Sequence, residues 1–141
     1  EDREDRIVTV LAAAMMSTAT AGRAARRLGR RGERLAARWL RRRGYRILAR
    51  NLRSANRELD LLVASPDGRC VIVVEVKSGR QSFSTLLRRL SADQIRRLQS
   101  MARLLHAGRL VRRRPMRIDV VLVQLGPIWQ CRIRHLKGGS T

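Results

Sequence analysis

The sequence is poor in lysine, in acidic residues and in aromatic residues. Its 141 residues include 30 arginines but two lysines, and four of the eleven acids lie in the first five positions. Aromatic residues make up 3%, which argues against the platform of stacked bases that readers of single-stranded nucleic acid use. A carboxylate and a lysine nevertheless interrupt the apolar stretch VIVVEVK, at Glu75 and Lys77. These two residues are therefore rare types in an unusual place.

Cysteines and long apolar runs are also scarce. Cys70 and Cys131 are isolated, which excludes the paired spacing of zinc and redox motifs and favours thiols in a reducing cytoplasm. Residues 7–16 form an apolar run too short to span a bilayer, and the acidic EDREDR before it is unlike the basic start of a secretion signal. We expect a cytoplasmic protein that does not enter the membrane. Residues 1–28 are expected to be an N-terminal extension, partly helical or disordered.

Positive charge dominates what remains. A formal net charge of +21 makes a compact chain repel itself unless a polyanion is near. Nucleic acid is therefore the favoured partner, contacted through its backbone phosphates. Two alternatives stay open, namely an arginine-rich solvated surface produced by biased residue usage, and attraction to an anionic membrane.

The hydrophobic pattern predicts one α/β domain over residues 29–137, followed by a tail at 138–141. Apolar residues recur at helical spacing before Gly44, and again after a helix-capping sequence further on. Trp39 and Leu98 should be buried against the sheet. The predicted elements are a helix at 30–43, strands at 45–50, 58–64 and 71–77, a helix at 91–107, and strands at 116–125 and 128–136. This order describes a mixed sheet flanked by helices.

Strand alternation brings the rare charges together. In an extended strand Glu75 and Lys77 share one face with Val73. The SPDGR sequence predicts a turn that folds two strands into a hairpin centred near Asp67. Asp60 would then lie opposite Val73 and close to both charged residues.

Two interpretations of this cluster stay open. Carboxylates that meet on a partly buried sheet repel one another unless a cation neutralises them, and oxygen ligands at this spacing suit Mg²⁺ or Mn²⁺. Lys77 could then hold, or help deprotonate, a water aimed at a phosphodiester. The other interpretation is an ion pair between Lys77 and one acid that closes the end of the sheet.

Several motifs in register resemble a known family. Asp60, fourteen intervening residues and Glu75-Val76-Lys77 resemble the Asp…Glu-x-Lys core of restriction-endonuclease-like nucleases. The stretches RGERLAARWLRRRGYRILARN, RELDLL, VVEVKS and RIDVV are, in that order, similar to the YraN family, small bacterial proteins related to Holliday junction resolvases. The resemblance covers about residues 30–136. It implies a restriction-endonuclease-like α/β fold and cleavage of nucleic acid.

The resemblance also implies roles for individual residues. Asp60 and Glu75 match carboxylates that bind the metal, the Val76 carbonyl matches a third ligand, and Lys77 matches the catalytic amine. Glu33, in a Gly-Glu-x-x-Ala-Ala motif, matches an acid that faces the metal in related resolvases. Its alternative role is that of an ordinary acid in the first turn of a helix, favoured by the helix dipole.

Other positions are expected to support the site or depart from the family pattern. Glu58 and Gln94 are expected to contact the metal ligands without binding the metal themselves. The family usually has Gly in place of Arg57, Phe in place of Val73 and Lys in place of Gln94, so a phosphate or metal contact is expected to be missing at the last position. Asp119, in an Arg-x-Asp sequence, is expected to be structural.

The leading hypothesis is a metal-dependent, structure-sensitive DNA endonuclease. Its rivals are a nucleic-acid-binding protein that keeps the fold without turnover, and a structural RNA-associated protein whose acids are merely ion-paired. A homodimer is expected by analogy with resolvases, which pair to cut two strands. Arginines of the second helix and the loop after it should grip phosphates without reading sequence: Arg88, Arg89, Arg96, Arg97, Arg103, Arg112, Arg113 and Arg114.

Overall fold

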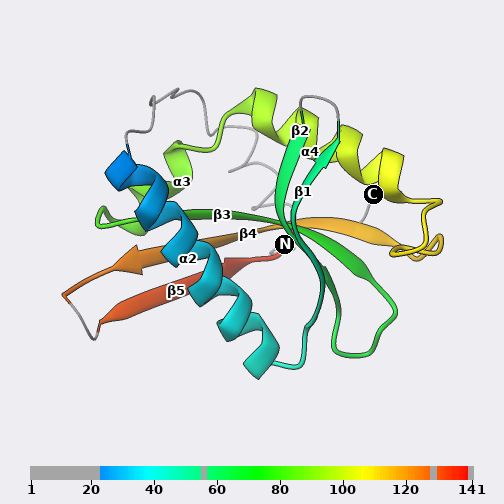
Figure 1. Ribbon diagram of the computed structural model, residues 1–141, viewed down its shortest axis with the longest axis horizontal. Coiled ribbons are helices and arrows are strands. Elements are labelled where there is room, and N and C mark those ends of the chain that lie inside the picture. The colour runs from blue at the N-terminus through cyan, green and yellow to red at the C-terminus, as the bar shows by residue number, and fades with distance from the viewer. Residues whose placement is uncertain (1–22, 55–56, 128–129, 140–141) are drawn as a thin grey trace.

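The chain forms a mixed β-sheet with helices on both faces (Figure 1). A computed structural model describes residues 23–54, 57–127 and 130–139. The elements are α2 (Arg23–Arg42), β1 (Arg46–Ser54), β2 (Arg57–Ala64), β3 (Val71–Gly79), α3 (Phe83–Arg88), α4 (Ala92–Leu105), β4 (Met116–Leu125) and β5 (Cys131–Leu136). No helix in this part of the chain has the length and apolar content that a membrane crossing requires.

The five strands stand side by side in the order in which they follow along the chain. β3 and β4 are parallel, and the other neighbouring pairs are antiparallel. The predicted fold class is confirmed, since this is a single α/β domain with a mixed sheet flanked by helices, consistent with a restriction-endonuclease-like fold.

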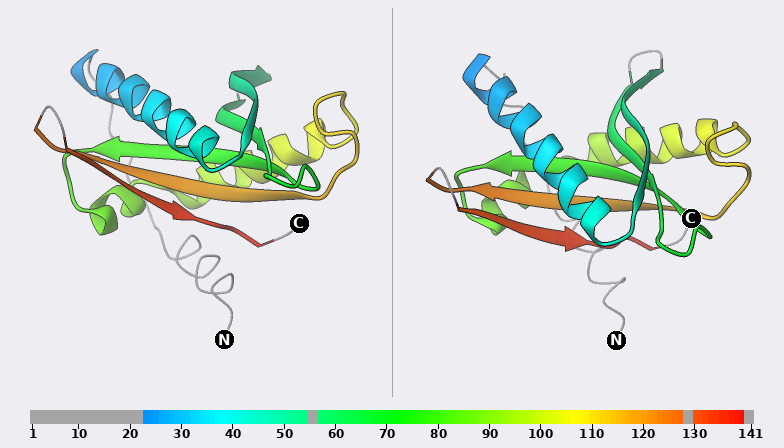
Figure 2. Two further views of the ribbon diagram at one scale, coloured as in Figure 1. Left: turned by 90° about the horizontal axis from the view of Figure 1, so that it is seen from below. Right: turned by 60° about the horizontal axis from the view of Figure 1, so that its bottom comes forward.

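Apolar side chains fill the two layers between sheet and helices. α2 covers one face, and α3 and α4 cover the other (Figure 1 and Figure 2). On the α2 side, Ala36 and Leu40 are buried with Val74 of β3. On the α4 side, the adjacent Val73 is buried with Leu98. The alternation read from the sequence of β3 is therefore confirmed, and both faces of this strand are covered.

Leu98 and Leu104 offer a matched test of which face of α4 is buried. Leu98 is 3% exposed and Leu104 is 59% exposed. Leu98→Ala is expected to lower the free energy of unfolding by about 2–5 kcal/mol because it leaves a cavity, whereas Leu104→Ala should change it by less than about 0.5 kcal/mol. Urea denaturation of both variants measures the difference. Equal losses would show that the wrong face has been assigned to the core.

Three features differ from the predicted elements. α2 begins at Arg23, so it includes part of the predicted extension, whose residues 1–22 lie outside the described chain. The short helix α3, capped by Ser82, is missing from the prediction because six residues give no periodic signal.

Trp39, which was expected to be buried against the sheet, is half-buried. It packs edge-on against His135 of β5, with Arg43 over its ring. The predicted start of the last strand, residues 128–129, also lies outside the described residues.

β2 leaves β3 partway along its length. Their ladder runs from Ala64↔Val71 to Leu61↔Val74, and β2 then continues to Arg57 beside β1. Figure 2 shows the β1–β2 hairpin turning away from the plane of the other strands. A gap in the sheet therefore opens beside the second half of β3.

The hairpin register differs from the predicted one. Extending the observed ladder by one step sets Asp60 beside Glu75, whereas the prediction placed Asp60 opposite Val73. The difference arises because the turn is centred between Asp67 and Gly68, and Gly68 supplies the left-handed conformation there with φ of 74°. The two carboxylates are consequently nearer to each other than the sequence indicated.

Candidate active site

Asp60 lies where β2 leaves β3. Its Oδ2 accepts a hydrogen bond from the Val76 N–H at 2.8 Å, so the side chain takes the place of a backbone partner for β3. In an antiparallel ladder, the N–H and C=O of one residue point toward the same neighbouring strand. The Val76 carbonyl is therefore directed toward the same gap as its N–H. The Asp60 carboxylate and the Val76 carbonyl therefore lie beside each other in this gap.

Glu75 and Lys77 flank Val76 in β3 and lie on the sheet face that α3 and α4 cover. The Lys77 Nζ lies 3.4 Å from the Glu75 Oε1, and each side chain is 12% exposed. The contact that the alternative interpretation requires is therefore present. It is also nearly shut off from water, which strengthens every charge interaction within it.

Glu33 comes to this cluster from α2 because glycine precedes it. A Cβ on Gly32 would lie 2.3 Å from the Ser78 Cβ, so α2 approaches the end of β3 more closely than any other residue type allows. The Glu33 carboxyl group donates a hydrogen bond to Asp60. The structure thus brings together the acids that the family resemblance assigned to the site.

Burial raises the pKa of each of the three carboxyl groups, and the charge of a neighbouring carboxylate adds to the effect. Burial first, then the charge of Asp60, raises the pKa of Glu75 to about 8, although Lys77 opposes this. Burial and then Asp60 also raise the pKa of Glu33 to about 7. The pKa of Asp60 is raised by burial against the opposing effect of the Val76 N–H. Lys77 alone therefore does not neutralise the cluster, which holds protons at neutral pH unless another cation replaces them.

Two cavities meet at Asp60. One, of about 270 Å³, lies toward α4, and the other, of about 150 Å³, lies toward α2 and β1. Besides Asp60, the first is lined by Glu58, Glu75, Gln94, Arg97 and Leu98. The second is lined by Arg30, Glu33, Arg34, Arg50, Asn51 and Leu61. Acids thus lie at the junction of the cavities and arginines on both sides.

Three arginines of the second cavity are absent from the predicted site. Arg30 and Arg34 flank Glu33 at helical spacing, and a projection of α2 could have placed them on its face. Arg50 is harder to place from sequence because the β1–β2 register shifts between Ile47 and Ala49. No local pattern in the sequence indicates that shift.

The donor atoms fit a hard divalent ion whose coordination is completed by water. Within the described residues, no group of three or more His, Cys, Asp and Glu side chains is arranged to hold a metal ion. Asp60, Glu75 and the Val76 carbonyl nevertheless supply oxygen donors at one place, which suits Mg²⁺ or Mn²⁺. A cation there would also offset the repulsion that raises the carboxyl pKa values.

The two residues predicted to support the ligands have other partners. Glu58 lies 3.6 Å from Arg53, and its side chain is half exposed. The Gln94 Oε1 accepts the Ser91 N–H at 3.0 Å in the capping box of α4. Both residues line the α4-side cavity, so they contribute to its wall. The uncharged Gln94 is explained by helix capping.

Comparison with known proteins identifies the family. Residues 32–123 match the uncharacterised protein family UPF0102. This range contains Glu33, Asp60, Glu75 and Lys77. The chain belongs to UPF0102. Proteins named UPF0102 protein from Mycobacterium sp. strains JLS, KMS and MCS are each 39% identical to it over 112 residues, 79% of this chain and 83% of the relative. The predicted membership of the YraN family is thereby confirmed.

Some of the arginines predicted to bind phosphates have structural contacts in this UPF0102 chain. Arg89 is the C-cap of α3 and donates from Nη1 to the Ser78 carbonyl at 2.8 Å. Arg114 donates to three backbone carbonyls of its own connection and of the β2–β3 turn. Arg96 is paired with Asp93 on the surface of α4. The guanidinium groups of Arg89 and Arg114 therefore already have backbone partners, and their role in binding phosphate stays a prediction.

The remaining predicted arginines are exposed but belong to different elements. Arg88 ends α3 and does not lie on the second helix as predicted. Arg97 lies on α4 at the wall of the acidic cavity, and Arg103 is on the last turn of that helix. Arg112 and Arg113 lie on the α4–β4 connection. Arg97 is thus the member of the set placed beside the acids.

Asp119 has the structural role that its buried strand suggested. Its carboxylate accepts hydrogen bonds from Arg117 at 2.9 and 3.1 Å and from the Gly138 N–H at 2.9 Å, and it lies 2.6 Å from the His135 Nε2. Burial opposes ionisation, but the bonds from His135 and Arg117 leave the pKa of Asp119 lowered. This network fastens β5 and the start of the predicted tail to β4.

Proposed function

We propose that this protein is a metal-dependent endonuclease that hydrolyses phosphodiester bonds of DNA and responds to DNA structure, with branched DNA as the first candidate substrate. One observation carries the proposal: Asp60, Glu75 and Lys77 meet at the gap between β2 and β3, where burial makes paired carboxylates costly without a cation. If the acids served only as structural partners of Lys77, a third acid beside them, Glu33, would not be needed.

Each residue has a chemical task in this proposal. Asp60, Glu75 and the Val76 carbonyl would hold Mg²⁺ or Mn²⁺, which when bound stabilises charge on the phosphate and promotes ionisation of water. The Lys77 Nζ, beside Glu75, can hold the attacking water by a hydrogen bond and orient it toward phosphorus. Glu33 contacts Asp60 and would keep that carboxylate in position.

Arginines on either side of the acids would bind the flanking phosphates. Arg30, Arg34 and Arg50 line one cavity and Arg97 lines the other. Guanidinium groups bind phosphate in bidentate fashion and carry no base specificity in such contacts. Recognition would then depend on the shape of the DNA, and a homodimer would suit symmetrical cutting of two strands.

A second candidate is a nucleic-acid-binding protein of the same fold without turnover. The observation in its favour is that, in the described chain, no three acidic or imidazole side chains are arranged as a ready metal site. Gln94 at a position where the family usually has lysine points the same way. Both candidates predict DNA binding, so cleavage separates them.

A panel of labelled DNA substrates tests the proposal. Branched, nicked, linear duplex and single-stranded DNA would each be incubated with protein in Mg²⁺, in Mn²⁺ and in chelator. We expect cleavage in the metal lanes alone, strongest on a branched substrate. Wild-type protein that binds the DNA but cuts nothing in either metal would favour the second candidate.

A further inference from the structure

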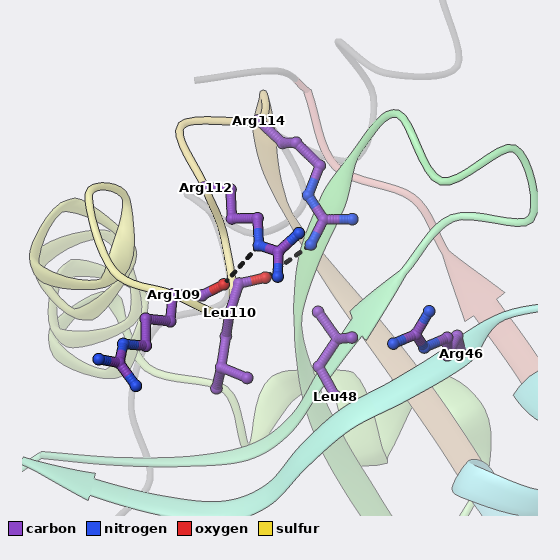
Figure 3. A pocket seen from close by; sticks show the side chains of 6 residues that line it. All are labelled: Arg46, Leu48, Arg109, Leu110, Arg112 and Arg114. Carbon is purple, nitrogen blue, oxygen red and sulfur yellow. Dashed lines mark hydrogen bonds between the residues drawn. The ribbon is translucent and has the colours of Figure 1, made fainter.

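A second basic cleft lies at the far end of α4 from the acidic cluster. Its volume is about 380 Å³, and its walls come from β1 and from the α4–β4 connection. The lining residues are Arg46, Leu48, Arg109, Leu110, Arg112 and Arg114. Figure 3 shows Arg112 and Arg114 reaching in from the connection, Arg46 coming from β1 across Leu48, and Arg109 extending outward. Arginines from two separate segments thus line one hollow.

The α4–β4 connection holds its arginines in fixed positions. Arg112 and Arg113 have φ of 53° and 58°, a left-handed conformation that costs an L-residue about 1–2 kcal/mol. The conformation is maintained by the buried Val111, by Arg112 Nε donating to the Arg109 carbonyl at 3.2 Å, and by the carbonyl contacts of Arg114. Strain held in this way is typical of sites that are organised before a ligand arrives.

The composition of the cleft selects an anion. No acidic residue is among the described residues that line it, so its cations repel one another unless an anion enters. Arg46 is exposed, and Arg112 lines the hollow while its Nε donates to the Arg109 carbonyl (Figure 3). Phosphate oxygens match the forked geometry of guanidinium. Leu48 and Leu110 add an apolar wall of the kind that a sugar can contact.

We propose that this cleft binds a phosphate of the nucleic-acid backbone at a distance from the acidic cluster. The inference rests on the proposed function in one respect, namely that the same nucleic acid occupies both sites. Gln94 lies at the acidic cavity and Leu105 ends α4 before the basic cleft, a span of about 16 Å at 1.5 Å per residue. That span corresponds to about five nucleotides along one strand. The substrate is therefore a nucleic acid that extends by at least this length beyond the acidic site.

Paired variants and DNA length test this site without any metal. Arg46→Gln combined with Arg112→Asn removes two charges, and asparagine tolerates the left-handed backbone at 112. Arg38→Gln with Arg42→Gln on the exposed side of α2 removes the same charge elsewhere. Fluorescence anisotropy in chelator would measure the affinity of each protein for a duplex of about 20 base pairs and for a short duplex of about 4 base pairs closed by a hairpin loop, which differ in whether they can span both sites.

The cleft variant should bind the long duplex at least about 10-fold more weakly, with a salt slope reduced by about 0.9 for each phosphate that it no longer binds. Its affinity for the short duplex should match that of the α2 variant. The single variant Arg46→Gln, at the exposed start of β1, should show part of the same effect if the double variant folds poorly.

Two results would overturn the inference. One is a cleft variant that behaves like the α2 variant with the long duplex. The other is a cleft that serves small anions, in which inorganic phosphate raises the melting temperature of the wild type but not of the cleft variant, and DNA affinity is unchanged. Because no step uses a metal, failure of the protein to cut DNA would contradict the proposed function and leave this binding result standing.

Discussion

Lys77→Met is expected to bind Mn²⁺ and DNA as the wild type does and to cleave DNA about 10²–10⁴-fold more slowly. The Nζ lies beside Glu75 in a site that is nearly closed to water, so its task in the proposed mechanism is to act on the attacking water. Methionine preserves the length and apolar stem of the side chain. Single-turnover cleavage at saturating protein measures the chemical step apart from binding.

The sequence offers a matched control, since Lys137 is its other lysine and is exposed. Lys137→Met removes the same charge and should cleave at the wild-type rate. Equal rates for the two variants would remove Lys77 from the mechanism. Loss of DNA affinity in Lys77→Met would instead assign the amine to substrate binding.

Removing one carboxylate should leave the metal-free protein as stable as the wild type, or more stable. Asp60→Asn keeps an oxygen that can accept the Val76 N–H, and Glu75→Gln keeps the shape of its side chain. Each change removes one of the carboxylates whose burial, with the charge of a neighbouring carboxylate, raises the pKa. Both variants should also lose cleavage. If the acids serve instead to pair Lys77, the same changes should strand a buried charge and cost about 3–5 kcal/mol.

The burial of these carboxyl groups, together with the charge of Asp60, also predicts how stability depends on pH in chelator. The folded-state pKa values of Glu75, about 8, and Glu33, about 7, exceed their ordinary value of 4.5. Between these values the folded protein binds more protons than the unfolded chain, so stability should fall as pH rises from about 5 to about 8. Mn²⁺ should reduce this fall, and Glu75→Gln should flatten it.

Asp119 makes folding stability depend on pH in the opposite direction and over a lower pH range. Its pKa is lowered from 3.8, so its contribution is present above that value and is lost as pH falls below it. Thermal unfolding in chelator across both ranges separates the two groups. A metal-free protein that gains stability as pH rises toward 8 would contradict the repulsion inferred for the acidic cluster.

The parts of the fold that sequence predicts are those with a local periodic signal. The bounds of β4 agree with the predicted 116–125, and Leu98 lies on the buried face of α4. The proximity of Asp60, Glu75 and Lys77 also follows from alternation on two strands joined by a turn. Each of these rests on residues close together in the chain or on a regular repeat.

The parts that sequence does not predict depend on contacts between distant segments. The gap between β2 and β3 is created by the departure of a whole hairpin, and no residue pattern marks it. Glu33 meets Asp60 because Gly32 packs on Ser78, which only the assembled layers reveal. Arg89 and Arg114 bind backbone carbonyls of other elements, so counting exposed charges overestimates what they offer to DNA.

Isothermal titration of Mn²⁺ into the metal-free protein at neutral pH would show whether the acidic cluster is a metal site. Two buffers of different ionisation enthalpy would reveal proton release, and Glu75→Gln would serve as the control. We expect one saturable binding event in the wild type, with protons released from the cluster whose pKa values are raised, and its loss in the variant. A wild type without saturable heat, or a Glu75→Gln protein that binds Mn²⁺ equally well, would contradict a metal site at these carboxylates.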